Sequence, residues 1–409
     1  MYNEVRAQSE CLAAPLNKED YVVQSMPDVS PTKWHLAHTT WFFETFLLTA
    51  YVPNYRSVHD AYAFLFNSYY EGAGPRHTRS QRGLLSRPSV DEVYAYRHEV
   101  DRRMRQLMND LPPEVVQQAH RRITIGLHHE QQHQELLLMD IKHVFSLNPL
   151  RPEYLPRPDQ PAESSRPTQP PPLQWLGHDG GLVEVGSTGG FSFDNETPRH
   201  KVHLDAFQLT SRPVTNAEYL EFIRDRGYER PDLWLSDGWS TRCTEQWTAP
   251  LYWYEQDGQW MEFTLHGARP IRPCEPVVHV SLYEADAFAR WAGYRLPTEF
   301  EWEIVASLQS TDGQYMRDGL LHPVEVSSDS HQFFGSVWEH TQSPYSPYPR
   351  FKPLEGTLGE YNGKFMCNQN VLRGGSCMTP NGHLRASYRN FFYPHQRWSA
   401  MGIRLAKDV

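Results

Sequence analysis

In the first part of the chain, apolar positions recur every three to four residues, which is the spacing of amphipathic helices. One helix is expected over residues 30–44, with Ser30 as its N-cap and Pro31 at its first position. Further helices are expected over residues 90–111 and, opened by two prolines, over residues 112–145. Several amphipathic helices with inward-facing histidines predict a helical bundle.

The pattern changes at two places. Residues 55–90 lack helical periodicity and are rich in Gly, Pro and Ser, so we expect a loop there and no helix. Nine prolines fall within residues 149–174, which predicts an extended linker that no packed element interrupts. The predicted organisation is therefore a helical bundle over 1–148, this linker, and a second domain over 175–409.

The second domain has a different composition, with short apolar runs between Gly-, Pro- and Trp-rich turn signals. Strands are expected around 182–185, 202–204 and 277–280. Two short helices are expected around 216–226 and 282–292. This mixture predicts an irregular α+β domain, so the fold class is multidomain, α followed by α+β.

Composition and charge narrow the function. A formal net charge of -10 argues against nucleic acid and anionic membranes as partners. The N-terminus lacks the apolar core of a signal peptide, and no run of about 18 apolar residues occurs. The five cysteines form no CxxC pair and are typical of a reducing cytoplasm. We expect a cytoplasmic protein that acts on small molecules, and no pattern specifies its oligomeric state.

The first candidate chemistry is a metal site. Because four residues advance a helix by about 400°, His129 and His133 project from one face, as two imidazoles that share a metal must. Glu135 lies about 200° round from His133 and suits an outer-shell role better than ligation. A third ligand must come from elsewhere. His38 faces inward among aromatic residues and is the candidate, with His35 one turn back as its competitor.

The loop between the helices offers a substrate wall. Tyr69 and Tyr70 are adjacent there, followed by Arg76, Arg79 and Arg82. Guanidinium groups bind carboxylates in a bidentate manner, so the arginines can hold an acidic substrate. A phenol with a pKa of about 10 stays protonated at neutral pH, so Tyr69 or Tyr70 is the expected donor of a proton or hydrogen bond during catalysis. The alternative is a solvated basic loop with structural tyrosines.

Both halves carry motifs of a known family. His38 together with the pattern His129-x3-His133-x-Glu135 resembles the DinB-like helical bundle of sulfoxide synthases. The second half resembles the formylglycine-generating (sulfatase-modifying) enzymes, whose fold is C-type-lectin-like. Its markers are PVTNAEY at 213–219, RLPTEFEWE at 295–303, GSVWE at 335–339, LRGGS at 372–376 and GIRLA at 402–406.

The fusion of these halves in this order is similar to the sulfoxide synthases of ergothioneine biosynthesis. The resemblance implies a non-haem Fe(II) cofactor held by His38, His129 and His133. It implies that a cysteine-type thiol and O2 react with hercynine, the Nα-trimethylated form of histidine, to join sulfur to C2 of the imidazole as a sulfoxide. Three protein ligands leave positions open on an octahedral ion, as this chemistry requires.

The resemblance also assigns substrate contacts. Gln132 is placed to hydrogen-bond the imidazole of hercynine, Asn390 matches a position that holds its carboxylate, and Phe391 and Phe392 can face its trimethylammonium group. In the branch of the family that uses γ-glutamylcysteine, the position of Phe392 holds an acid. We therefore expect free L-cysteine as the thiol.

The clamp for the carboxylate of this thiol is expected to be Arg79 or Arg82, with Arg76 in reserve.

Three alternatives remain at this point. Three histidines also suit Zn2+, which would indicate a DinB-type thiol transferase or hydrolase. An ovothiol-type synthase joins sulfur to C5 of unmethylated histidine and usually carries an additional methyltransferase domain. A non-catalytic lectin-like binding module would leave the histidine pair without a role.

Overall fold

The computed structural model describes residues 1–157, 166–316, 319–327 and 331–409. Their contacts divide the chain into two units, of which the first combines Met1–Tyr154 with Leu354–Tyr361 and the second holds the rest. Residues 158–165 of the expected linker lie outside the described residues, and the linker stays a prediction. The sequence pattern did not indicate that residues 354–361 belong to the first unit.

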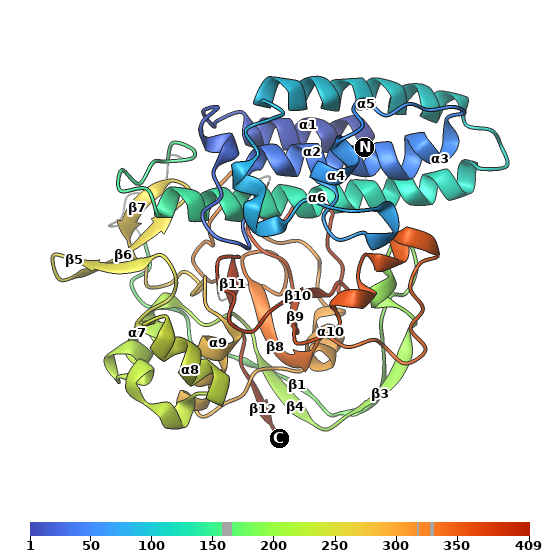
Figure 1. Cartoon of the computed structure of the whole chain (residues 1–409). Coiled ribbons are helices and arrows are strands. Elements are labelled where there is room, and N and C mark those ends of the chain that lie inside the picture. Colours follow the sequence, from blue (N-terminus) through green and yellow to red (C-terminus); the bar gives the residue numbers. More distant parts are fainter. Residues whose placement is uncertain (158–165, 317–318, 328–330) are drawn as a thin grey trace. The chain divides into compact units, whose positions relative to one another are not determined.

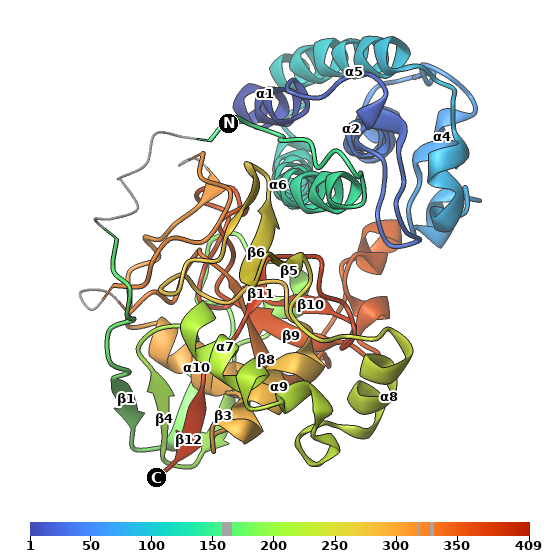
Figure 2. The same ribbon diagram turned by 90° about the vertical axis from the view of Figure 1, so that its left-hand side faces the viewer.

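The first unit is the expected helical bundle, and its long helices lie side by side in both views (Figure 1, Figure 2). Helix α2, Thr32–Phe43, packs against α5, Val90–Asp110, and against α6, Val116–Ser146. The side chain of Ser89 caps α5 and forms a capping box with Glu92. Helix α2 continues into a π-helical turn, Glu44–Leu48, and α3, Thr49–Tyr51.

Helix α1, Tyr2–Ala13, precedes the helix that the pattern predicted to be the first, and it packs on α6. Its apolar pattern is weak because its buried face includes Arg6 and Ser9. Both donate hydrogen bonds to Glu130 of α6, which Arg97 also contacts. Although burial raises the pKa of Glu130, the charges of the two arginines lower it to about 2. A buried ionic network, rather than an apolar stripe, fixes α1.

The predicted cap of α2 is wrong. The helix begins at Thr32, and no side chain caps it. The amide of Ser30 donates instead to Asp140 Oδ2 at 2.8 Å, and its hydroxyl accepts a hydrogen bond from Arg82 at 2.9 Å. Tertiary partners therefore occupy the groups that a local cap would have used.

Residues 55–90 are mainly loop, but the expectation of no helix there is wrong, because the segment contains α4, Tyr62–Phe66, and the 3-10 turns Glu71–Ala73 and Arg79–Leu84. The buried ammonium of Lys33 donates to the carbonyls of Leu85 and Pro88 and so fastens the end of this loop to α2.

The second unit contains small sheets, whose strands other than β2 are labelled in Figure 1. Strands β8, β9, β10 and β11 form one sheet in the order β10-β9-β8-β11, and β1, β4 and β12 form another in the order β1-β4-β12. Two hairpin-like sheets, β2-β3 and β5-β6-β7, complete the set in the described residues. The strands are β1 Trp175–His178, β2 Gly181–Val185, β3 His200–Leu204, β4 Phe207–Thr210, β5 Trp253–Gln256, β6 Gln259–Thr264, β7 Gly267–Pro270, β8 Trp338–Pro344, β9 Asn370–Arg373, β10 Asn390–Phe392, β11 Met401–Gly402 and β12 Ala406–Asp408.

The two predicted helices of this unit are α7, Asn216–Arg224, and α9, Leu282–Trp291. The pattern missed α8, Ser236–Thr244, and α10, Glu299–Ala306. The α+β class is confirmed.

The strand expected around 277–280 is wrong. Val277 and Val280 are buried, but their amides bond to the carbonyls of Val214 and Met401. A φ of 65° at His279 breaks the extended backbone between them.

Two further observations concern partners and surfaces. Among the described residues, no helix has the length and apolar character needed to cross a bilayer. Cys11, Cys243 and Cys367 are exposed, and Cys274 and Cys377 are buried.

Candidate metal centre

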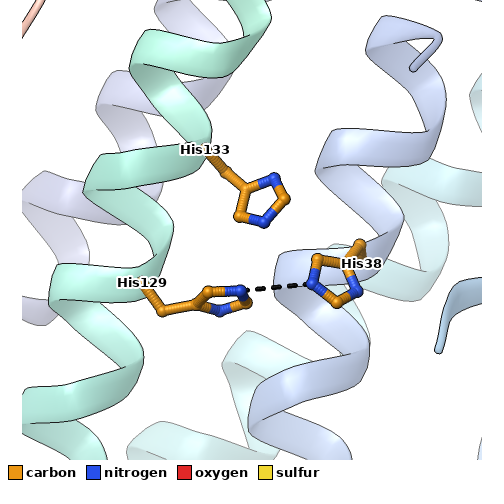
Figure 3. Close-up of side chains that lie close together, drawn as sticks. All are labelled: His38, His129 and His133. Carbon is orange, nitrogen blue, oxygen red and sulfur yellow. Dashed lines mark hydrogen bonds between the residues drawn. The ribbon is translucent and has the colours of Figure 1, made fainter. Parts of the chain in front are cut away.

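Helices α2 and α6 bring together the three histidines that the sequence singled out. Figure 3 shows His38 on α2 pointing toward His129 and His133 on α6. One ring nitrogen from each lies within 4.8 Å of the others; His38 and His129 are buried and His133 is half-buried. The i, i+4 spacing on α6 places two of them on one helix face, and α2 supplies the third. The histidines thus form the expected cluster.

The hydrogen bonds of His38 show which of its ring nitrogens can bind a metal. Its Nδ1 lies 2.6 Å from the carbonyl oxygen of Phe66, which can only accept, so Nδ1 carries the proton and Nε2 keeps its lone pair. This Nε2 lies 3.2 Å from Nε2 of His129. Two nitrogens about 2.1 Å from one ion are about 3.0 Å apart at a right angle and about 3.4 Å apart at the tetrahedral angle. The observed separation fits one shared ion.

The electrostatics of the cluster keep all three rings neutral. Burial lowers the pKa of His129 to about 3. Burial, and then the neighbouring histidine charges, lower the pKa values of His38 and His133 well below the usual range. A metal ligand must be a neutral imidazole at working pH, so the residues present fit a divalent cation.

His35, the competing candidate, does not join the cluster. Its Nδ1 lies 2.9 Å from Nδ1 of His133, and its Nε2 lies 3.0 Å from Oδ2 of Asp140. His35 therefore lies behind a ligand rather than beside the metal position.

Aromatic rings connect Tyr69 and Tyr70 to the histidine cluster. The two tyrosines are stacked at 4.5 Å, and the Tyr69 hydroxyl donates to that of Tyr70 at 3.4 Å. Tyr70 is fully buried against Trp41, whose ring stacks on His38 at 5.5 Å. Burial, followed by the charge of Tyr69, raises the pKa of Tyr70 well above its usual value. The hydroxyl of Tyr70 therefore stays protonated at neutral pH.

Tyr361 is a site residue that the sequence reasoning missed. Its ring packs edge-on against His129 with 5.6 Å between centroids, and its hydroxyl donates to Oε1 of Gln132. It also packs against Tyr69 at 6.4 Å. No local pattern indicates this, because the segment that carries Tyr361 lies more than 200 residues from α6 in the sequence.

A carboxylate fastens this segment to the loop of the first unit. Glu360 accepts hydrogen bonds from the amides of Glu71 and Gly72, both at 2.8 Å. A Cβ at Gly72 would lie 2.7 Å from Oγ1 of Thr357, so a larger residue there would have to displace this side chain.

The structure separates the two candidate arginines. Arg79 is exposed and donates to the carbonyl of Asp28. Arg82 is buried, with its guanidinium carbon 3.3 Å from the ring centroid of Trp34, and Trp34 stacks on His38 at 4.6 Å. Among the described residues, no carboxylate forms an ion pair with Arg82, and its Nε has no hydrogen-bond partner. Burial, and then the charge of Arg79, lower the pKa of Arg82 well below its usual range.

Asn390, Phe391 and Phe392 belong to the second unit, on β10. Tyr345 covers one face of Phe391 with 4.1 Å between centroids and 11° between ring planes. Phe392 contacts Trp398 edge-on. All three residues are half-buried.

The second unit holds another group of potential ligands, Glu262, Glu275 and His322. Arg269 donates to both carboxylates, at 2.9 Å from Nε to Glu262, and its Nη2 contacts Glu275. A guanidinium already supplies the positive charge that this pair of acids needs, so we assign the group to a buried ionic network.

Comparison with known proteins identifies the family. A hercynine oxygenase from Mycolicibacterium smegmatis is 31% identical over 425 aligned residues, which cover 94% of this chain and 93% of that protein. The chain belongs to the hercynine oxygenase family. A second member, from Mycolicibacterium thermoresistibile, is 37% identical over 54% of each chain.

The family models match the same architecture. The DinB superfamily matches residues 1–139, and the sulfatase-modifying factor enzyme 1-like domain matches 162–329 and 325–409. A formylglycine-generating enzyme from Streptomyces coelicolor is 28% identical over 54% of this chain and 84% of its own length. The resemblance drawn from sequence motifs and the predicted fold class are both confirmed.

Proposed function

We propose that this chain is a hercynine oxygenase that uses Fe(II) and O2 to join the sulfur of L-cysteine to C2 of the hercynine imidazole. The observation that carries the proposal is the cluster of three neutral histidines within a chain that matches a hercynine oxygenase over 94% of its length. The reaction consumes one C–H and one S–H bond and one O2. One oxygen atom enters the sulfoxide and the other leaves as water, so the four electrons taken up by O2 are balanced.

In this proposal His38, His129 and His133 hold the metal, and Fe(II) supplies the redox chemistry that activates O2. Helices α2 and α6 hold the three rings close together, with His38 and His129 buried and His133 half-buried. This arrangement supports the proposal that the substrates meet at this cluster.

Arg82 is proposed to bind the carboxylate of cysteine. A guanidinium that is buried beside the histidines without a carboxylate partner favours an incoming anion, since pairing restores the solvation that burial removed. Arg79 is exposed and bonded to a backbone carbonyl, so it is the lesser candidate.

The proposed proton donor is Tyr69 or Tyr70. Tyr69 donates to Tyr70, and the raised pKa of Tyr70 keeps its hydroxyl protonated. A proton delivered by this pair would assist formation of the water that leaves the reaction.

Hercynine is proposed to contact Gln132 through its imidazole, Asn390 through its carboxylate, and Phe391 and Phe392 through its trimethylammonium group. Half-buried aromatic rings on β10 suit a quaternary ammonium, which has no N–H to donate. Free L-cysteine is preferred to γ-glutamylcysteine because Phe392 cannot pair with the ammonium of a glutamyl group.

The test is anaerobic loading of metal-free protein with Fe(II), followed by addition of O2, hercynine and L-cysteine. Mass analysis should find a product heavier than hercynine by one cysteine and one oxygen, less two hydrogens. Formation of cystine or cysteine sulfinic acid alone would contradict the proposal.

A further inference from the structure

A series of hydrogen bonds runs from the metal cluster along the contact between α2 and α6. It begins at Nδ1 of His133, which lies 2.9 Å from Nδ1 of His35, and continues from Nε2 of His35 to Oδ2 of Asp140 at 3.0 Å. The same oxygen of Asp140 accepts the amide of Ser30 at 2.8 Å. His35 and Asp140 are each 3% exposed, so water does not compete for these bonds.

The positions of these residues on α2 and α6 explain how the hydrogen bonds form. His133 and Asp140 are seven residues apart on α6, which places them on one face within about 20° of each other. His35 lies one turn before His38 on α2 and so faces the stretch of α6 between His133 and Asp140. The same pair of helices therefore supplies the ligand cluster and the bonds behind it.

The direction of the protons follows from the acceptor at the end. A carboxylate only accepts, so Nε2 of His35 donates to Asp140. In the neutral imidazole the other nitrogen is then an acceptor, so Nδ1 of His133 must donate to Nδ1 of His35. His133 is held as the tautomer whose Nε2 lone pair is free.

We propose that Asp140 and His35 are positioning residues that fix the tautomer and the ring orientation of His133, so that His133 presents Nε2 to the metal. The inference rests on the proposed three-histidine metal site and adds two residues to it. The tautomer of His38 is fixed more simply, by its hydrogen bond to the carbonyl oxygen of Phe66. His129 has no such hydrogen bond, because its Nδ1 has no partner among the described residues.

In this proposal His35 does not bind the metal but orients His133, which does. Removing His35 should let the His133 ring rotate and exchange tautomers, which weakens binding without removing a ligand. Outer-shell changes of this kind reduce metal affinity by about 10- to 100-fold.

The experiment measures the Fe(II) dissociation constant anaerobically, by competition with a chelator, in the full chain and in four variants. His35→Leu should weaken binding by about 10- to 100-fold, and Asp140→Asn should weaken it less. His35→Gln should bind nearly as the parent does, since its amide can accept from His133 and donate to Asp140. The control is His143→Leu, which removes another buried imidazole of α6 that bonds to Ser25.

X-ray absorption of the Fe(II)-loaded proteins counts the coordinated imidazoles. Three should remain in His35→Leu and in His35→Gln, and a loss of one imidazole in both variants would show that His35 is itself a ligand and overturn the proposal. Unchanged affinity in both His35→Leu and Asp140→Asn would also overturn it. If His35→Leu does not fold, Asp140→Asn, judged against His35→Gln, decides the question alone.

Failure of the metal site itself gives a different result. If the parent protein binds no Fe(II), or if His38→Ala binds it equally well, the proposed function is wrong whatever the His35 variants do.

Discussion

The hydroxyl of Tyr361 donates a hydrogen bond to Oε1 of Gln132, although 229 residues separate the two in the sequence. Tyr361 reaches this position because Glu360 accepts the amides of Glu71 and Gly72 in the loop of the first unit. A residue proposed to bind hercynine is thus held by a tyrosine from a distant segment.

Tyr361→Phe should therefore raise the KM for hercynine by about 2- to 12-fold, the equivalent of one hydrogen bond. The reason is that the amide of Gln132 loses the donor that orients it. Gln132→Ala should have a similar effect, and the double variant should be no worse than either single variant. Steady-state kinetics at saturating cysteine and O2 measure this, and additive effects would contradict a shared role.

Replacement of a metal ligand should abolish activity and leave the fold intact. His129→Ala is expected to lose Fe(II) binding and sulfoxide formation, because two imidazoles hold the ion poorly. The matched control is His120→Ala, an exposed histidine on the same helix.

The identity of the metal is tested on stripped protein. Fe(II) should restore turnover and Zn2+ should not, since Zn2+ is redox-inert and cannot activate O2. Full recovery with Zn2+ alone would favour the transferase or hydrolase alternative.

Tyr69→Phe and Tyr70→Phe separate the two candidate proton donors. The variant that removes the donor should form sulfoxide more slowly or divert cysteine to sulfinic acid, because proton delivery no longer accompanies reduction of O2. Product analysis by mass spectrometry distinguishes these outcomes. Unaltered rates and products in both variants would show that the pair is structural.

Arg82→Gln should lower kcat/KM for L-cysteine by about 10- to 150-fold, which corresponds to one charge-assisted hydrogen bond. Arg79→Gln is the control on the same 3-10 turn and should have a small effect, because Arg79 is exposed. The same measurements with γ-glutamylcysteine test the thiol. A preference of the parent enzyme for the longer thiol would rule out L-cysteine as its natural substrate.

His340 gives the second unit a predictable dependence of stability on pH. Burial lowers its pKa to about 4, although a hydrogen bond to the Val280 carbonyl opposes the shift. An unfolded histidine has a pKa of about 6.5, so the unfolded chain binds more protons between about pH 6.5 and pH 4. Stability is therefore full above this window and falls as the pH drops through it.

Between about pH 7.5 and about pH 5, the decrease in the free energy of unfolding that is attributable to His340 should approach about 2 kcal/mol. Urea unfolding at both pH values measures it. His340→Gln should show a smaller decrease between the two pH values, whatever its absolute stability. An identical decrease in parent and variant would assign the pH dependence to other groups.

The sequence by itself determined the features that depend on local spacing. The pairing of His129 with His133 follows from the pitch of one helix, and α5 follows from its apolar period and the Ser89 capping box. The order of the two halves and their class also follow from motifs and patterning, since these are properties of contiguous segments.

Only the tertiary structure decided between residues that are equivalent along one element. His35 and His38 share a face of α2. His38 contacts His129 and joins the cluster, whereas His35 contacts Nδ1 of His133 and lies outside it. Arg79 and Arg82 lie on one 3-10 turn, yet burial against Trp34 distinguishes Arg82. Such choices depend on what packs across from a residue, and no local period carries that information.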